Sequence, residues 1–377
     1  MDPSLYFLWS CLTDAVRSDA VALARPISRH VAGRNKIEYY LTTFERQFVI
    51  VSTSLNVVST FPFSAASQQL LREAGATESV VVTTSDELST CLPGTEILCS
   101  YTLPVNWRTL APNLRWLQFP GAGIDSLAPT GILGADSGVI VTTAAGIHAI
   151  NISEYVFGSM LMFNWNWPQM VRLQDGHVWA RSATWYNLGG RELMGQALGI
   201  IGLGHIGRRI AQLGHAFGMR VLATSRSIRD EAYQDPDVDQ SFPVDKLREL
   251  LGSSDYVVIS VPLTRETEKL IGEPELRAMR RNAYLVNVAR GRVIDEQALV
   301  RALHEGWIAG AGLDVAEEEP LPPQSPLYSM PNVILTPHIS GNSVYYEARL
   351  AALFAENLRR YRAGQPLQNR YDPARGY

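Results

Sequence analysis

The sequence predicts an α/β protein made of two doubly wound units, each with a parallel β-sheet. From Gln47 onward, short continuous apolar runs alternate with helical or loop stretches. Such runs are typical of parallel strands that helices cover on both faces. A strand–turn–helix pattern with three glycines then opens a second series of runs. The chain has 377 residues, which is long for one domain, since domains commonly hold about 100–200 residues.

The first series of apolar runs predicts one sheet. Its expected strands are Phe48–Val51, Val80–Thr83, Ile97–Ser100, Leu114–Gln118 and Val139–Thr142, and its expected helices include Ser64–Ala74 and Asn106–Leu110. A glycine-rich turn over 119–125 follows the fourth run. Backbone N–H groups at the carboxyl end of a parallel strand form a natural cradle for an anion.

A long helix is expected to connect the two series. We expect it to start near Asn151, which is a good N-cap residue and is followed three residues later by Glu154. The segment after it is rich in tryptophan: Trp165, Trp167, Trp179 and Trp185. These side chains could form core, a lid or a subunit interface, and the sequence does not choose among the three.

The second series begins with a dinucleotide-binding pattern. The apolar run Ala197–Ile201 is followed by Gly202, Gly204 and Gly207 in G-x-G-x-x-G spacing, and helical periodicity follows. In this context the glycines allow a tight turn, close approach of a diphosphate and close packing of helix on strand. The diphosphate would bind the N–H groups at the start of the helix. We therefore expect cofactor contacts from these glycines, His205 and Ile206.

The residues after the next strand indicate which dinucleotide is bound. An NAD-preferring site places an acidic residue there, about twenty residues beyond the glycines. Here the residues are Ser225, Arg226 and Ser227. Two hydroxyls and a guanidinium can hydrogen-bond a 2′-phosphate, which a carboxylate would repel. The sequence therefore predicts NADP(H) as the preferred cofactor, with NAD(H) possible.

The remaining runs complete the second sheet. Expected strands are Val221–Thr224, Tyr256–Val261, Tyr284–Val288, Ala309–Val315 and Val333–Thr336, and expected helices are Val244–Leu251, Glu273–Met279 and Glu296–Glu305. A last helix should run from about Ser343 to Ala363, because Gly364 and Pro366 stop it.

Three polar residues follow successive strands of this second sheet: Arg290, Glu319 and His338. Ligands of open α/β sheets bind at this edge. A histidine titrates near neutral pH and suits proton transfer, and a guanidinium suits a carboxylate. Each residue alone could be an ordinary surface group, but their joint placement predicts a catalytic set.

The motifs around these residues resemble the D-isomer-specific 2-hydroxyacid dehydrogenase family over roughly residues 95–365. The matching motifs are Val261-Pro-Leu-Thr264 with Thr267, Asn287-Val-Ala-Arg-Gly291, Gly312-Leu-Asp-Val315, Glu319-Pro-Leu-Pro322 and Thr336-Pro-His338. The resemblance implies a flavodoxin-like substrate domain with a Rossmann cofactor domain inserted in it. We assign 1–45 to an N-terminal extension, 46–147 with 337–377 to the substrate domain, and 148–336 to the Rossmann domain.

The resemblance also implies roles for individual residues. His338 would give a proton to the substrate oxygen, Glu319 would orient His338, and Arg290 would bind the substrate carboxylate. The N–H groups of Ala122 and Gly123 would bind the same carboxylate. Apart from the resemblance, we expect the wall of the substrate pocket to include residues near Tyr101, Gly121 and Trp185. Further cofactor contacts are expected from Val261, Pro262, Thr267, Val288, Ala289, Arg290, Asp314 and His338; Asp314 would bind the nicotinamide carboxamide.

The function hypothesis is NADPH-dependent reduction of a small 2-oxo acid to a D-2-hydroxy acid. The Ser225–Ser227 string resembles that of the NADPH-using glyoxylate and hydroxypyruvate reductases. Glu319 argues against the formate dehydrogenase branch, which has glutamine there. The alternative is a dinucleotide-sensing binding protein, as in the transcriptional corepressors of this fold, which keep the same three residues.

Composition excludes several other classes. With 46% hydrophobic and 19% charged residues and a net charge of −4, nothing favours a nucleic-acid or anionic-membrane partner. No apolar run reaches a membrane span of about 18 residues. Cys11, Cys91 and Cys99 have no metal-ligand spacing, so we expect reduced thiols, no metal and a cytoplasmic protein. We expect a homodimer.

Overall fold

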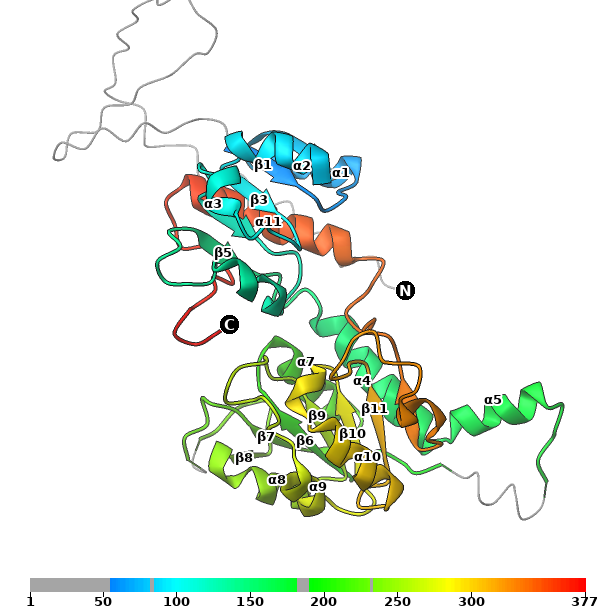
Figure 1. The fold of residues 1–377 in the computed structure, drawn as a ribbon. Coiled ribbons are helices and arrows are strands. Elements are labelled where there is room, and N and C mark those ends of the chain that lie inside the picture. Colours follow the sequence, from blue (N-terminus) through cyan, green and yellow to red (C-terminus); the bar gives the residue numbers. More distant parts are fainter. Residues whose placement is uncertain (1–54, 82–84, 182–189, 231–232) are drawn as a thin grey trace, which may run out of the picture. The chain divides into compact units, whose positions relative to one another are not determined.

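The computed structural model describes residues 55–81, 85–181, 190–230 and 233–377. It contains two β-sheets, and every registered pair of strands in them is parallel (Figure 1). The predicted α/β class with two parallel sheets is therefore confirmed. No described helix combines the length and apolar character needed to cross a membrane.

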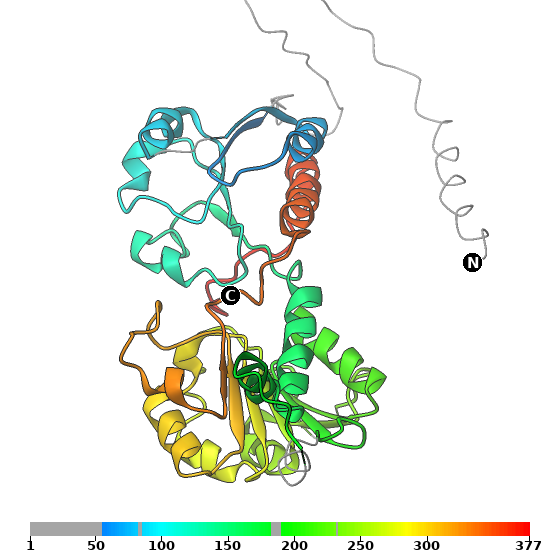
Figure 2. The same cartoon turned by 90° about the vertical axis from the view of Figure 1, so that its right-hand side faces the viewer.

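The first sheet has the strand order β2-β1-β3-β4-β5, the flavodoxin order. Its strands are β1 (Leu55–Ser59), β2 (Ala76–Val81), β3 (Ile97–Cys99), β4 (Trp116–Gln118) and β5 (Ile140–Thr142). One apolar cluster joins this sheet to α1 (Ala65–Glu73) and α11 (Tyr346–Arg362), and another joins it to α2 (Ser85–Cys91) and α3 (Trp107–Leu110). Figure 2 shows α1 and α11 side by side, and the Ser64 N–H donates to Glu347 Oε1 at 2.8 Å. The last helix therefore packs on the first sheet.

The second sheet has the order β12-β11-β10-β9-β6-β7-β8. The chain adds β7 and β8 on one side of β6 and β9 to β12 on the other, so the strand order reverses between β6 and β9. Its strands are β6 (Ala197–Ile201), β7 (Arg220–Thr224), β8 (Gln240–Phe242), β9 (Tyr256–Ile259), β10 (Tyr284–Asn287), β11 (Gly310–Leu313) and β12 (Val333–Leu335). On one face lie α4 (Ala149–Asn164) and α7 (His205–Ala216); on the other lie α8 (Leu247–Ser253), α9 (Glu273–Ala278) and α10 (Glu296–His304). This is the Rossmann order, and ligands of such sheets bind at the reversal.

Two strands are absent from the sequence prediction. The run LNVVS of β1 is interrupted by the polar, exposed Asn56, whose side chain donates to the Gly94 carbonyl. The edge strand β8 reads QSF, and its two polar residues leave no apolar run that would predict a strand. The predicted strand Phe48–Val51, part of Val80–Thr83 and the extension 1–45 lie outside the described residues.

The predicted connecting helix, α4, is present and begins close to Asn151, but the N-cap role predicted for Asn151 is wrong. The helix begins at Ala149, and His148 is in the N-cap position without a side-chain cap. The Asn151 amide instead donates to the Ser340 carbonyl at 2.7 Å. Its side chain is therefore used to hold the loop after β12.

The tryptophan-rich segment is not core where it is described. Trp165, Trp167 and Trp179 are 49%, 56% and 84% exposed, and Trp185 lies outside the described residues. The helix α5 (Trp167–Asp175) has no buried residue.

Candidate active site

The glycine turn between β6 and α7 has the geometry of a diphosphate cradle. Gly202 has a φ of +100°, which favours glycine. A Cβ on Gly207 would lie 2.0 Å from the Gly202 carbonyl oxygen, whereas a Cβ on Gly204 would meet no atom within 4 Å. The turn thus packs tightly on one side and is open on the other. The first N–H groups of α7, from His205 onward, have no partner within the helix and can bind an anion.

The turn after β7 carries the three residues predicted to select the cofactor. The Ser225 and Ser227 hydroxyls lie 2.7 Å apart, and the Ile228 N–H donates to the Ser225 carbonyl at 3.0 Å. Arg226 is exposed. Two hydroxyls and a cation therefore share one tight turn, a donor set that fits the 2′-phosphate of NADP.

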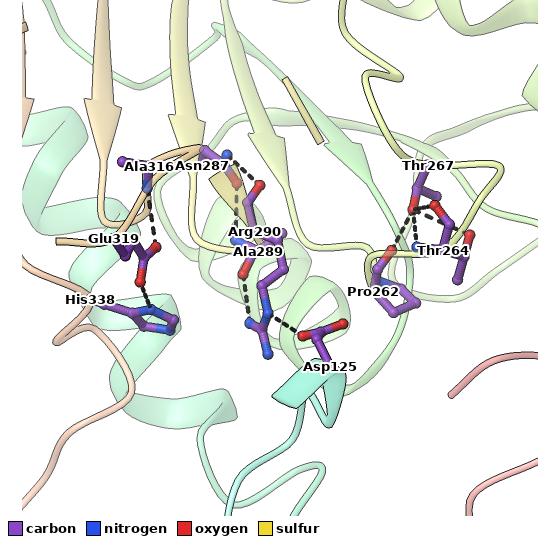
Figure 3. Close-up of polar contacts among 10 residues, drawn as sticks. All are labelled: Asp125, Pro262, Thr264, Thr267, Asn287, Ala289, Arg290, Ala316, Glu319 and His338. Atoms are coloured by element: carbon purple, nitrogen blue, oxygen red, sulfur yellow. Dashed lines mark hydrogen bonds and ion pairs between the residues drawn. The ribbon is translucent and has the colours of Figure 1, made fainter. Parts of the chain in front are cut away.

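The loop after β9 is closed by a threonine. Thr267 Oγ1 donates to the Pro262 carbonyl at 2.7 Å and accepts from the Thr264 N–H at 2.7 Å (Figure 3). This loop follows the strand next to β6, at the sheet's reversal point. Val261, Pro262 and Thr267 therefore border the same edge as the glycine turn.

The loop after β10 positions Arg290. The oxygen of the buried Asn287 side-chain amide accepts from the Ala289 N–H at 3.0 Å, and its NH₂ group donates to the Arg290 carbonyl at 3.0 Å. These two hydrogen bonds fix the backbone of the loop. Val288 and Ala289 are buried. Sequence reasoning gave Asn287 no role of its own, although it stands in the quoted motif.

The Arg290 guanidinium contacts the glycine-rich turn after β4. Its Nε donates to Asp125 Oδ2 at 2.8 Å, and its Nη1 donates to the Ala289 carbonyl at 2.8 Å (Figure 3). A Cβ on Gly123 would lie 1.5 Å from Arg290 Nη2, so a larger residue there would require the Arg290 side chain to move. The N–H groups of Ala122 and Gly123 have no acceptor among the described residues. Asp125 is a partner of Arg290 that sequence reasoning missed.

Glu319 and His338 come from the loops after β11 and β12 and are hydrogen-bonded to each other. His338 Nδ1 lies 2.7 Å from Glu319 Oε2, and Glu319 Oε1 accepts from the Ala316 N–H at 3.1 Å. The side chains are about half exposed, at 48% and 37%. Because the carboxylate occupies Nδ1, the other ring nitrogen, Nε2, is left for a ligand.

Buried Asp314 holds the backbone of the His338 loop. Its carboxylate accepts from Thr336 Oγ1 at 2.6 Å, the Ile339 N–H at 2.9 Å and the Ser340 N–H at 2.9 Å. The His338 N–H donates to the Asp314 carbonyl at 2.8 Å. His338 has a φ of +53°, uncommon for a residue other than glycine, so this clamp sustains a strained position. A contact from Asp314 to a nicotinamide carboxamide stays a prediction.

Tyr101 lies against the glycine-rich turn and pairs with a residue of α11. Its hydroxyl hydrogen-bonds the Tyr346 hydroxyl, which donates to the Pro120 carbonyl at 2.8 Å. A Cβ on Gly121 would lie 3.5 Å from the Tyr101 ring. Burial raises the pKa of Tyr101 above its ordinary value, so the hydroxyl stays a neutral donor or acceptor. The sequence did not single out Tyr346.

Arg290, Glu319 and His338 thus project from three neighbouring loops at one edge of the second sheet (Figure 3). The arrangement combines a cation for a carboxylate with an oriented imidazole that can move a proton. Among the described residues no cluster of His, Cys, Asp and Glu has the form of a metal site.

Comparisons with known proteins point to one family. Residues 157–340 match the model of the D-isomer specific 2-hydroxyacid dehydrogenase NAD binding domain. A glyoxylate reductase of Korarchaeum cryptofilum is 37% identical over 261 residues, which are 68% of this chain and 75% of that protein.

Solved structures of the same family resemble this chain. A D-isomer specific 2-hydroxyacid dehydrogenase family protein of Aeromonas salmonicida superposes with a TM-score of 0.73 at 31% identity, over 85% of this chain and 100% of that one. A D-isomer specific 2-hydroxyacid dehydrogenase of Xanthobacter autotrophicus, in complex with NADPH and MES, has a TM-score of 0.71 at 30% identity, over 86% and 100%.

Proposed function

Because this chain belongs to the D-isomer-specific 2-hydroxyacid dehydrogenase family, and is thus an NAD(P)-dependent oxidoreductase, we propose that it uses NADPH to reduce a small 2-oxo acid. The proposed substrate resembles glyoxylate or hydroxypyruvate, and the proposed product is the D-2-hydroxy acid. The observation that carries the proposal is the His338–Glu319 pair at 2.7 Å, on the same sheet edge as Arg290.

The substrate carboxylate is bound by Arg290 together with the N–H groups of Ala122 and Gly123. A planar guanidinium and two backbone donors suit a carboxylate and also polarise the adjacent keto oxygen. The two backbone donors follow β4 of the first sheet and Arg290 follows β10 of the second. We propose 46–147 with 337–377 as the substrate domain and 148–336 as the cofactor domain.

His338 supplies the proton. NADPH, when bound, would supply the hydride for the keto carbon, and reduction there leaves negative charge on the substrate oxygen. His338 Nε2–H donates its proton to that oxygen, while Glu319 keeps the ring in orientation and stabilises its cationic form. A positioned general acid contributes about 10²–10⁴-fold to the rate.

NADPH preference is supported by the turn after β7. It offers the Ser225 and Ser227 hydroxyls and the Arg226 cation, with no carboxylate at the position where NAD-preferring sites place one. A structural neighbour crystallised with NADPH agrees with this choice.

The test is a steady-state comparison of glyoxylate, hydroxypyruvate, pyruvate and bulkier 2-oxo acids, each with NADPH and NADH. We expect the short substrates and NADPH to give the highest kcat/KM. The product configuration is read from hydroxypyruvate by chiral chromatography, because glycolate is achiral. Binding of NADPH without oxidation by any acid in the panel would refute the proposal and favour the dinucleotide-sensing alternative.

Variants of His338 test its proposed role as the general acid. His338→Gln should lower kcat about 10²–10⁴-fold and leave NADPH affinity within about twofold. The matched control is His304→Gln, an exposed histidine on α10, which should keep wild-type kcat. Equal rates for both variants would exclude the proposed role of His338.

A homodimer and a cytoplasmic location belong to the same proposal. The segment around α5 exposes Trp165, Trp167 and Val171, and a cavity of about 440 Å³ lies between Phe163, Pro168 and the β12 end of the second sheet. Exposed aromatic patches of this kind mark protein interfaces. Light scattering should give twice the chain mass, and Trp167→Glu should lower it; a monomeric wild-type protein would contradict the assembly.

A further inference from the structure

The segment 370–377 connects the edge of the first sheet to the cofactor loops. Arg370 forms an antiparallel bridge with Thr142, and the Tyr371 N–H donates to the Val141 carbonyl at 2.8 Å. Asp372 then closes a turn: its carbonyl accepts from the Gly376 N–H at 2.9 Å, and its N–H donates to the Tyr377 carbonyl at 3.2 Å. The segment is therefore anchored at one end and internally hydrogen-bonded at the other.

This turn lies on two loops of the second sheet. The Tyr377 ring centroid is 4.5 Å from Arg226 Cζ. A Cβ on Gly376 would lie 3.6 Å from the Thr264 methyl group. The two contacts fall on the turn after β7 and the loop after β9, which are the loops proposed above to hold NADP.

Arg226 Cζ lies over the face of the Tyr377 ring, and such a contact restricts the guanidinium without a hydrogen bond to it. Cation–π attraction acts through the face, whereas the N–H groups point outward in the plane. Among the described residues Arg226 forms no ion pair within 4.0 Å. The nearby Glu266 carboxylate has a lowered pKa, first because of a hydrogen bond with the Thr264 side chain and to a smaller extent because of Arg226. No described carboxylate lies within ion-pair distance of Arg226, so its cation can bind an anion, with Glu266 as the nearby competitor.

We propose that Tyr377 is a positioning residue of the cofactor site, which holds the Arg226 guanidinium so that its donor edge faces the 2′-phosphate of NADPH. The inference rests on the proposed NADPH preference and deepens it. Ser225 and Ser227 supply hydroxyls from the same turn, and Tyr377 restricts the one long, exposed side chain of the set. A residue about 150 positions away in sequence thus contributes to cofactor specificity.

The experiment measures binding of NADPH and NADH by fluorescence titration, and of 2′,5′-ADP and 5′-AMP by calorimetry. Removal of an exposed cation–π contact is expected to weaken affinity roughly 2- to 5-fold. Tyr377→Ala should show this loss for NADPH and 2′,5′-ADP and no change for NADH and 5′-AMP. Tyr377→Phe keeps the ring and should bind like wild type. Tyr345→Ala, which removes another tyrosine stacked on an arginine, Arg349, is the control and should change none of these affinities.

The Arg226→Ala variant tests whether the effect of Tyr377 on NADPH affinity depends on Arg226. If Tyr377 acts through Arg226, the Tyr377→Ala change should cause no further loss of NADPH affinity in the Arg226→Ala background. Wild-type affinities are compared first, and equal binding of NADPH and NADH there refutes the cofactor proposal itself. If wild type prefers NADPH but Tyr377→Ala leaves that ratio unchanged, the inference alone is overturned. Tighter binding of both cofactors by Tyr377→Ala would also overturn it, because the ring would then occupy cofactor space.

Discussion

Replacing Asp314 with asparagine tests whether the buried carboxylate holds His338 in place for catalysis. Asp314 is 1% exposed and accepts three hydrogen bonds through its side chain, two of them from the backbone N–H groups of Ile339 and Ser340. Asparagine has one acceptor oxygen where aspartate has two. With that oxygen toward Ile339 and Thr336, the new NH₂ group faces the Ser340 N–H, and two donors oppose each other.

The expected loss of loop stability and of rate follows from the hydrogen bonds that Asp314→Asn removes. A buried donor without a partner costs about 1–3 kcal/mol, and the bonds that survive lose the strength of a charged acceptor. His338 has a φ of +53°, a conformation that costs about 1–2 kcal/mol and needs such support. A loss of about 2 kcal/mol lowers the equilibrium constant between the native loop and its alternatives roughly 30-fold, and a small displacement of His338 is itself costly to the rate. We therefore expect kcat to fall roughly 10- to 100-fold.

Stopped-flow single turnover with NADPH and hydroxypyruvate measures the chemical step, and titration measures NADPH affinity separately, because Asp314 is also a predicted carboxamide ligand. Thermal unfolding should show a lower Tm. Asp245→Asn removes the same charge from an exposed position before α8 and should leave both rate and Tm unchanged. An Asp314→Asn enzyme with a wild-type single-turnover rate would refute the reasoning.

Three further predictions follow from the same geometry. Glu319→Gln removes the charge beside His338 while keeping an acceptor, and should lower kcat about 10-fold; an unaltered kcat would contradict its role. Ser225→Asp places a carboxylate beside the 2′-phosphate, and the NADPH/NADH ratio of kcat/KM should fall at least about 10-fold, the equivalent of about 1.4 kcal/mol; a constant ratio would argue against the proposed turn. Burial lowers the pKa of His148, so the unfolded chain takes up this proton more readily. Its contribution to stability is therefore full above about pH 6.5 and is lost as the pH falls below it; Tm measured from pH 7.5 to 5 should fall less in His148→Gln, and equal slopes would contradict this.

Local pattern was sufficient for most of the fold and for the positions of the polar loops. The apolar run before Gly202, the glycine spacing and the helical period after it are read within twenty residues. The loops of Arg290, Glu319 and His338 meet at one edge because their strands are parallel neighbours, a consequence of topology. The two strands that the sequence did not predict lack a continuous apolar run: β1 is interrupted by Asn56, and β8 has two polar residues out of three.

The sequence by itself determined the two parallel sheets, the dinucleotide turn and the residue types at the strand ends, because periodicity and glycine chemistry act over a few neighbouring residues. Only the tertiary structure decided which distant groups meet. Asp125 and Arg290 are 165 positions apart, and no local rule joins them, nor Tyr377 to Arg226. Such pairs depend on how loops from separate elements approach one another, and that approach is set by the packing of the whole chain.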